Sequence, residues 1–87
     1  MTRAQEIRKE VLFQLYGGKE VPCAPTLIVR RAKREGLDYT ETEVRDALYF
    51  LKGQGFAELV SDETTGQQKY RITSRGMIQY EQQDSPG

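Results

Sequence analysis

The chain has 87 residues, a length that fits one domain, and it is 37 % hydrophobic and 30 % charged, as ordinary globular proteins are. It contains no histidine and one cysteine, which excludes an internal disulfide, a Ser-His or Cys-His catalytic pair and a Cys/His zinc site. The formal net charge is zero but unevenly spread, since residues 1–36 carry an excess of four positive charges and residues 37–66 an excess of five negative charges.

The first predicted helix covers residues 2–16. Thr2 and Gln5 have the spacing of a capping box, and Gly17-Gly18 is expected to end the helix. One helical stripe is formed by the apolar residues Ala4, Ile7, Val11, Leu12 and Leu15. Phe13 points away from this stripe, so we interpret it either as a partly covered surface aromatic or as a contact for a partner.

A connector and a second helix follow. Val21–Cys23 is compatible with one very short edge strand, in which Cys23 is a small buried residue. Residues 25–35 are predicted to be helical, because Pro25 suits the first turn of a helix and Gly36 suits its C-terminal cap.

The second helix carries the densest basic cluster of the chain, the run RRAKR. Its cations are Arg30, Arg31, Lys33 and Arg34. This cluster is either a solvated helix face, whose late cations also suit the helix dipole, or a surface that faces phosphate groups.

The third predicted helix, residues 40–52, has the clearest local signals. Thr40 and Glu43 form a capping box, and Gly53 and Gly55 close the helix. Its buried stripe is expected to consist of Val44, Ala47, Leu48 and Leu51.

A β-hairpin is predicted from residues 56–60 and 68–72, which alternate between apolar and polar side chains. The inward residues are Ala57, Leu59, Tyr70 and Ile72. Thr73 then caps a short last helix, and residues 82–87 are expected to be a disordered tail. The folded domain is therefore expected to span residues 1–81.

The order of these elements is helix, helix, tight turn, helix and hairpin. An isolated hairpin is barely stable in water, and three short helices need a lid over their core. The sequence therefore predicts an α+β, mainly α, winged helix-turn-helix: a three-helix bundle with a C-terminal hairpin wing and a short final helix.

Two stretches resemble a known family. TETEVRDALYFLKGQGFAELV (residues 40–60) resembles the recognition helix and first wing strand of winged-helix transcription regulators of the MarR and PadR kind, and YRITSRG (residues 70–76) resembles the end of their second wing strand. The resemblance covers roughly residues 2–80. It implies a regulator that binds duplex DNA, with the third helix in the major groove and the wing against the adjacent backbone.

Within this hypothesis each candidate contact has a role. The third helix presents its exposed side chains to bases or sugars, the cations of the second helix and wing engage phosphates, and the glutamines at the wing reach the minor groove. The expected DNA-binding residues are Arg30, Arg31, Lys33, Arg34, Thr40, Thr42, Arg45, Tyr49, Lys52, Gln67, Gln68, Lys69 and Arg71. For Arg45 an i,i+4 ion pair with Glu41 is an equally good interpretation.

A protein-contact module that does not bind DNA is the alternative. The net charge is zero, and the third helix carries the acidic residues Glu41, Glu43 and Asp46. Phe13 and Phe50 are then the candidate contacts for a second copy of the chain or another protein.

The composition also gives expectations about chemistry and location. No apolar run approaches the roughly 18–20 residues that a membrane-spanning helix needs, and the first ten residues lack the apolar stretch of a signal peptide. We therefore expect a cytoplasmic protein that is not an enzyme, binds no membrane and needs no cofactor.

Overall fold

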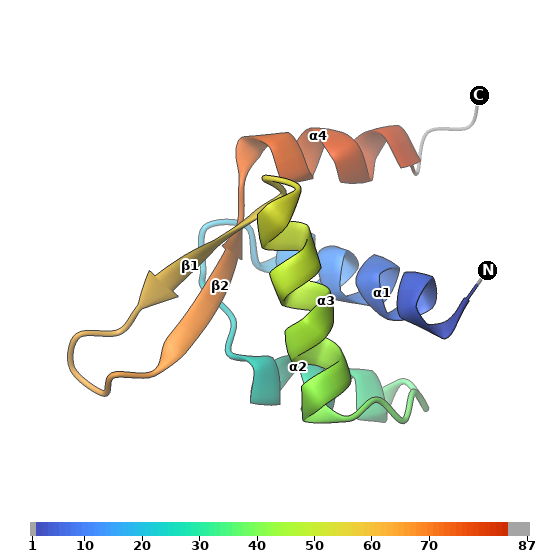
Figure 1. Ribbon diagram of the computed structural model, residues 1–87, viewed down its shortest axis with the longest axis horizontal. Coiled ribbons are helices and arrows are strands. Elements are labelled where there is room, and N and C mark those ends of the chain that lie inside the picture. Colours follow the sequence, from blue (N-terminus) through green and yellow to red (C-terminus); the bar gives the residue numbers. More distant parts are fainter. Residues whose placement is uncertain (1, 84–87) are drawn as a thin grey trace.

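The computed structural model describes residues 2–83 as a small, mainly helical α+β domain with four helices and one two-stranded antiparallel hairpin. The elements are α1 (Arg3–Gly18), α2 (Pro25–Arg34), α3 (Glu41–Gly53), β1 (Ala57–Ser61), β2 (Gln68–Ile72) and α4 (Ser74–Gln83). Figure 1 shows α3 running from the α2 end of the molecule to the α4 end, with the hairpin projecting away from the helices.

The predicted capping boxes are confirmed at the starts of α1 and α3. The Gln5 amide donates to Thr2 Oγ1 and the Glu43 amide donates to Thr40 Oγ1, each at 3.2 Å. Each box satisfies backbone donors that a helix N-terminus leaves without a partner. Gly36 follows α2 with φ +83°, a left-handed conformation that favours glycine and stops the helix.

The end of α1 differs from the prediction. The helix continues through Gly17 and Gly18, and the residue with positive φ is Lys19 (φ 48°), whose amide donates to the Leu15 carbonyl at 2.9 Å. Ala4 is exposed and not part of the buried stripe, because the first turn of α1 meets α3 through the polar residue Arg3.

The last helix is capped as predicted, since Thr73 Oγ1 accepts a hydrogen bond from the Gly76 amide at 3.0 Å. It extends to Gln83 and so includes two residues that the sequence assigned to a tail. The stacked rings of Tyr16 and Tyr80, with centroids 4.3 Å apart, hold α4 against α1. Residues 84–87, the rest of the expected tail, lie outside the described residues.

The predicted inward residues of the hairpin share one face, although β1 begins and ends one residue later than predicted. Ala57 pairs with Ile72 and Leu59 pairs with Tyr70, so all four side chains lie on one face. Cys23 adds a single bridge at the other edge of β2, where its amide donates to the Tyr70 carbonyl at 2.7 Å. The short edge strand expected in the connector is therefore one residue long.

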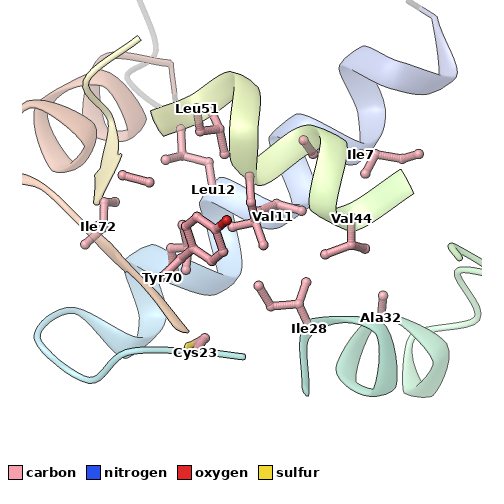
Figure 2. Close-up of a cluster of buried hydrophobic side chains, with 14 of the residues drawn as sticks. Ile7, Val11, Leu12, Cys23, Ile28, Ala32, Val44, Leu51, Tyr70 and Ile72 are labelled. Carbon is pink, nitrogen blue, oxygen red and sulfur yellow. The ribbon is translucent and has the colours of Figure 1, made fainter. Parts of the chain in front are cut away.

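One hydrophobic core joins the helices to the hairpin, as Figure 2 shows. Its completely buried side chains include Val11, Ile28, Val44 and Leu48, and the inward residues of the hairpin close it. Gln14 is the one buried polar residue in the described chain, and its amide donates to the Ile28 carbonyl at 3.1 Å. Within residues 2–83 no helix has the length and apolar character required to cross a membrane.

Candidate nucleic-acid interface

The two exposed sides of α3 differ in charge. Glu43 and Asp46 line a hollow that also contains Arg3 and Arg8 of α1. Phe50 lies on the same side, beneath the Arg8 guanidinium at 3.7 Å from the ring centroid. Two of the three acidic residues of α3 therefore face α1 and its arginines.

The other side of α3 carries the predicted contacts. Residues 42, 45, 49 and 52 follow an i, i+3, i+7, i+10 spacing, which places them along one stripe of a helix. This stripe, here called the α3 stripe, consists of Thr42, Arg45, Tyr49 and Lys52, all exposed. Tyr49 is 74 % exposed and is the most accessible large aromatic or aliphatic side chain among the described residues. The helix thus brings four of the predicted site residues together.

Arg45 is held by a neighbour on its own helix. Its Nη2 lies 2.7 Å from Glu41 Oε1, the i,i+4 pair considered from the sequence. Both side chains are about half exposed, and exposed pairs of this kind are worth only about 0–1 kcal/mol. Arg45 can therefore exchange this partner for another anion at small cost.

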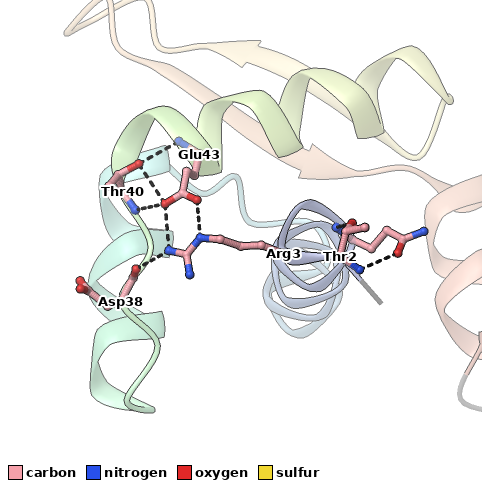
Figure 3. Close-up of polar contacts among 6 residues, drawn as sticks. Thr2, Arg3, Asp38, Thr40 and Glu43 are labelled. Carbon is pink, nitrogen blue, oxygen red and sulfur yellow. Dashed lines mark hydrogen bonds and ion pairs between the residues drawn. The ribbon is translucent and has the colours of Figure 1, made fainter.

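Glu43 belongs to a network that joins α1 to α3 (Figure 3). Arg3 Nε donates to Glu43 Oε2 at 2.6 Å, and Arg3 Nη2 donates to Glu43 Oε1 at 3.1 Å and to the Asp38 carbonyl at 2.8 Å. The hydrogen bond from Arg3, followed by that from the Thr40 amide, lowers the pKa of Glu43 to about 2. Glu43 is thus neutralised by α1 and adds no unpaired charge to the α3 stripe.

Thr40 belongs to the same hydrogen-bond network. Its amide donates to Glu43 Oε1 at 3.1 Å, and its hydroxyl accepts from the Glu43 amide. Its hydrogen-bonding groups therefore serve the helix cap, in contrast to the free hydroxyl expected of a DNA contact.

The four cations of the basic cluster of α2 have two kinds of surroundings. Arg31 and Arg34 line a hollow between the end of α1, the connector and α2, away from α3. Arg30 and Lys33 are exposed to solvent and do not line this hollow. Arg30 and Arg34 are i,i+4 neighbours on the exposed side of α2, so the cluster borders the connector at one edge and is open at the other.

The hairpin cations are also paired. Arg71 Nε donates to Glu58 Oε1 at 2.8 Å across the strands, and Lys69 Nζ lies 3.9 Å from Asp62 Oδ2. The Thr64 amide donates to Asp62 Oδ1 at 2.9 Å, and this bond is the main reason that the pKa of Asp62 lies below its ordinary value. The loop is therefore organised around an acidic residue.

The remaining predicted residues have different surroundings. Gln67 and Gln68 are exposed where the hairpin loop returns to β2. Phe13 is 46 % exposed and borders two hollows on α1, whereas Phe50 is 39 % exposed, lies beneath the Arg8 guanidinium and lines a different hollow. These two aromatics therefore do not form one surface.

Two features were not predicted from the sequence: the ion pair between Arg3 and Glu43, and the exposure of Val21. Arg3 was assigned no role, although it neutralises Glu43. The capping box already gave Glu43 a local partner in Thr40, so nothing in the sequence indicated a second partner on α1. Val21, 67 % exposed beside Phe13, was assigned only to a strand. Because Val21 precedes Pro22 in a connector, its exposure could have been predicted.

No family model matches the chain, and no curated protein matches its sequence. Among residues 2–83 there is no group of three or more acidic or cysteine side chains placed to hold a metal ion.

Proposed function

We propose that this protein is a winged-helix DNA-binding domain of a transcription regulator, resembling the MarR and PadR kind, with α3 as its recognition helix. In this proposal the α3 stripe enters the major groove, and the β1–β2 hairpin is the wing that follows the adjacent backbone. Arg45 reads a base edge, Lys52 and the cations of α2 and the hairpin engage phosphates, and no catalytic chemistry is involved.

The segregation of charge on α3 carries the proposal. The α3 stripe holds two cations and one exposed tyrosine. Two carboxylates border it: Glu41, which is bonded to Arg45, and the exposed Asp46, which lies four residues after Thr42. Glu43 and Asp46 lie on the side toward α1 with Arg3 and Arg8. Two of the three carboxylates of α3, Glu43 and Glu41, are therefore already paired with arginines.

The hairpin and α2 can add phosphate contacts. Arg71 and Lys69 are partly exposed in their ion pairs, and such pairs contribute little to stability, so a phosphate can compete for them. Arg30 and Lys33 of α2 are exposed without a carboxylate partner in the described part of the chain. The total is a small number of contacts, which gives weak and salt-sensitive binding by a single copy.

A protein-contact module is the second candidate function. It is favoured by the exposed apolar side chains of Phe13 and Val21, which lie beside one hollow. Arg45, Lys69 and Arg71, three of the predicted DNA contacts, already have carboxylate partners. In this case the α3 stripe remains free of nucleic acid.

Amide chemical shifts during titration with a mixed-sequence DNA duplex test the proposal at low and at moderate salt. We expect shifts confined to the α3 stripe, the hairpin and the exposed face of α2, and we expect them to shrink as the salt concentration rises. Absence of shifts at low salt and high protein concentration would exclude direct DNA binding. Shifts centred on α1 would instead favour the protein-contact module as the main use of the domain.

A further inference from the structure

A hollow of about 860 Å³ lies between α1, the end of α3 and α4. Helices α1 and α4 run in opposite directions on its two sides (Figure 1). We call this hollow the α1–α4 groove. Its lining consists of Gln5, Arg8, Lys9, Leu12, Phe50, Leu51, Gln54, Phe56, Gln79 and Gln83.

The apolar part of the α1–α4 groove combines core leucines with accessible rings. Leu12 and Leu51 are buried members of the hydrophobic core, and Phe56 packs against that core while it remains partly exposed. Phe50 is 39 % exposed. Apolar side chains that gather in one concave place are typical of a binding surface, whereas singly scattered ones are not.

The charged part of the groove has one sign. Arg8 and Lys9 line it together with four glutamines, and none of its lining residues is acidic. Asp46 lies near Arg8 and Glu6 lies near Lys9 in neighbouring hollows. Neither cation forms an ion pair with a carboxylate of residues 2–83. The groove therefore carries two positive charges that no described residue neutralises by direct contact.

Two arginines at the groove rest on its aromatic rings. The guanidinium carbon of Arg8 lies 3.7 Å from the ring centroid of Phe50, and that of Arg75 lies 5.8 Å from the centroid of Phe56. Stacking uses the face of a guanidinium and leaves its in-plane N–H donors available. Neither guanidinium donates a hydrogen bond within residues 2–83. Both are thus held ready for a planar anion such as a carboxylate, which two parallel N–H groups can bind.

The row of α4 beside the groove limits the length of an occupant. Arg75, Gln79 and Gln83 are each four residues apart, so they lie along one row of the helix. This row is about 12 Å long at 1.5 Å per residue, which matches roughly two turns of a helix. Glutamine side chains can both donate to and accept from a peptide backbone.

We propose that the α1–α4 groove binds a short, acidic, amphipathic segment of another protein. Apolar side chains of this segment pack on Phe50 and Phe56. Its carboxylates pair with Arg8, Lys9 and Arg75. The arginines cover the rings on which the bases of a nucleic acid strand would stack, which favours a peptide as the occupant.

The proposal goes beyond DNA binding and does not require it. None of the groove residues belongs to the α3 stripe, and the groove is a different surface from the hollow beside Phe13 and Val21. The positive charge and the apolar floor of the groove, taken together, specify the chemistry of the partner.

Selection of peptides of about 12 residues by the full chain, from a random display library, tests the proposal. We expect the enriched peptides to have a net negative charge and large apolar residues at helical spacing. Their binding should weaken as the salt concentration rises. With the tightest peptide, amide shifts should change along α1, the end of α3 and α4, and not along the α3 stripe.

Charge reversal at the groove should weaken binding of that peptide. We expect Lys9→Glu to reduce the affinity at least about tenfold, since an attraction becomes a repulsion. The matched control is Lys33→Glu, the same substitution at an exposed lysine of α2 outside the groove. It should leave the affinity unchanged.

A second pair of variants separates binding from folding. Gln79→Glu places a carboxylate in the groove, and Gln82→Glu makes the same change on α4 outside it. Neither glutamine has a hydrogen-bond partner among the described residues, so both variants should keep the unfolding midpoint. Only Gln79→Glu should weaken the peptide.

Several outcomes would overturn the proposal. Enrichment of no peptide, or of neutral or basic peptides, would do so, as would a peptide that Lys9→Glu and Gln79→Glu bind as tightly as wild type. Displacement of the peptide by a mixed-sequence DNA duplex would assign the groove to nucleic acid. Groove shifts that appear when the chain is concentrated without peptide would assign it to a second copy. The DNA titration of the α3 stripe is independent of all of these.

Discussion

Gly76 lies at the closest approach between α4 and the start of the hairpin. A Cβ atom built on it would meet the Phe56 carbonyl oxygen at 2.1 Å and Ile72 Cγ1 at 2.7 Å. The carbonyl cannot turn away, because it already accepts the Thr73 amide at 3.0 Å. The absence of a side chain at this position is therefore what lets α4 begin directly after β2.

Gly76→Ala should destabilise the fold by about 1–3 kcal/mol or more, since the added methyl group meets fixed backbone. The matched control is Gly53→Ala, which adds the same atom where nothing lies within 4 Å. Urea unfolding followed by circular dichroism measures both. If the two variants were equally stable, the close approach of α4 to Phe56 would be wrong.

At the scale of elements, the starts of α1 and α3 are fastened to each other by Arg3 and Glu43. The carboxylate accepts two bonds from the guanidinium and one from the Thr40 amide. The folded pKa of Glu43, about 2, lies below the ordinary value of 4.5. The ionised carboxylate therefore stabilises the fold above pH 4.5, and this contribution is lost as the pH falls toward 2.

Glu43→Gln should accordingly lower the free energy of unfolding at neutral pH. The difference from wild type should shrink between pH 4.5 and pH 2, because the wild-type carboxylate is then also protonated. Urea titrations at several pH values measure it, with exposed Glu20→Gln of the connector as control. A difference that stays constant down to pH 2 would show that the Arg3 pair does not stabilise the native state.

Local sequence signals predicted most of the elements. Thr40 with Glu43 located the start of α3, and alternation identified the residues of the hairpin that share its inner face. The predicted end of α1, at residue 16, was wrong by two residues. Gly17 and Gly18 are compatible with both a helix and its cap, and tertiary contacts decide between the two. Gly18 lies against Cys23 Sγ, where a Cβ atom would be 3.4 Å away, so the glycine serves packing inside the helix.

At the scale of the whole molecule, the two exposed sides of α3 differ in the charges that they carry. The acids of α3 near α1 face Arg3 and Arg8, and the opposite side presents Arg45 and Lys52. Helical spacing predicted the buried side of α3, because Val44, Ala47, Leu48 and Leu51 are all buried. The ion pair between Glu43 and Arg3 could not be predicted, because it depends on where α1 packs.

The candidate site was predictable only in part for the same reason. Helical spacing alone groups the α3 stripe, but the pairs formed by Lys69 and Arg71 depend on the hairpin loop and register. The division of the α2 cluster follows from the position of the connector beside Arg31 and Arg34.

The salt dependence of DNA affinity tests the central claim most directly, measured for wild type, Lys52→Gln on the α3 stripe and Lys9→Gln on α1. Each variant removes one exposed lysine, so the two differ only in where the charge is lost. We predict that Lys52→Gln reduces the slope of log affinity against log salt by about one, and that Lys9→Gln leaves it unchanged. Equal slopes for all three proteins, or a larger loss for Lys9→Gln, would contradict DNA binding through this side of α3.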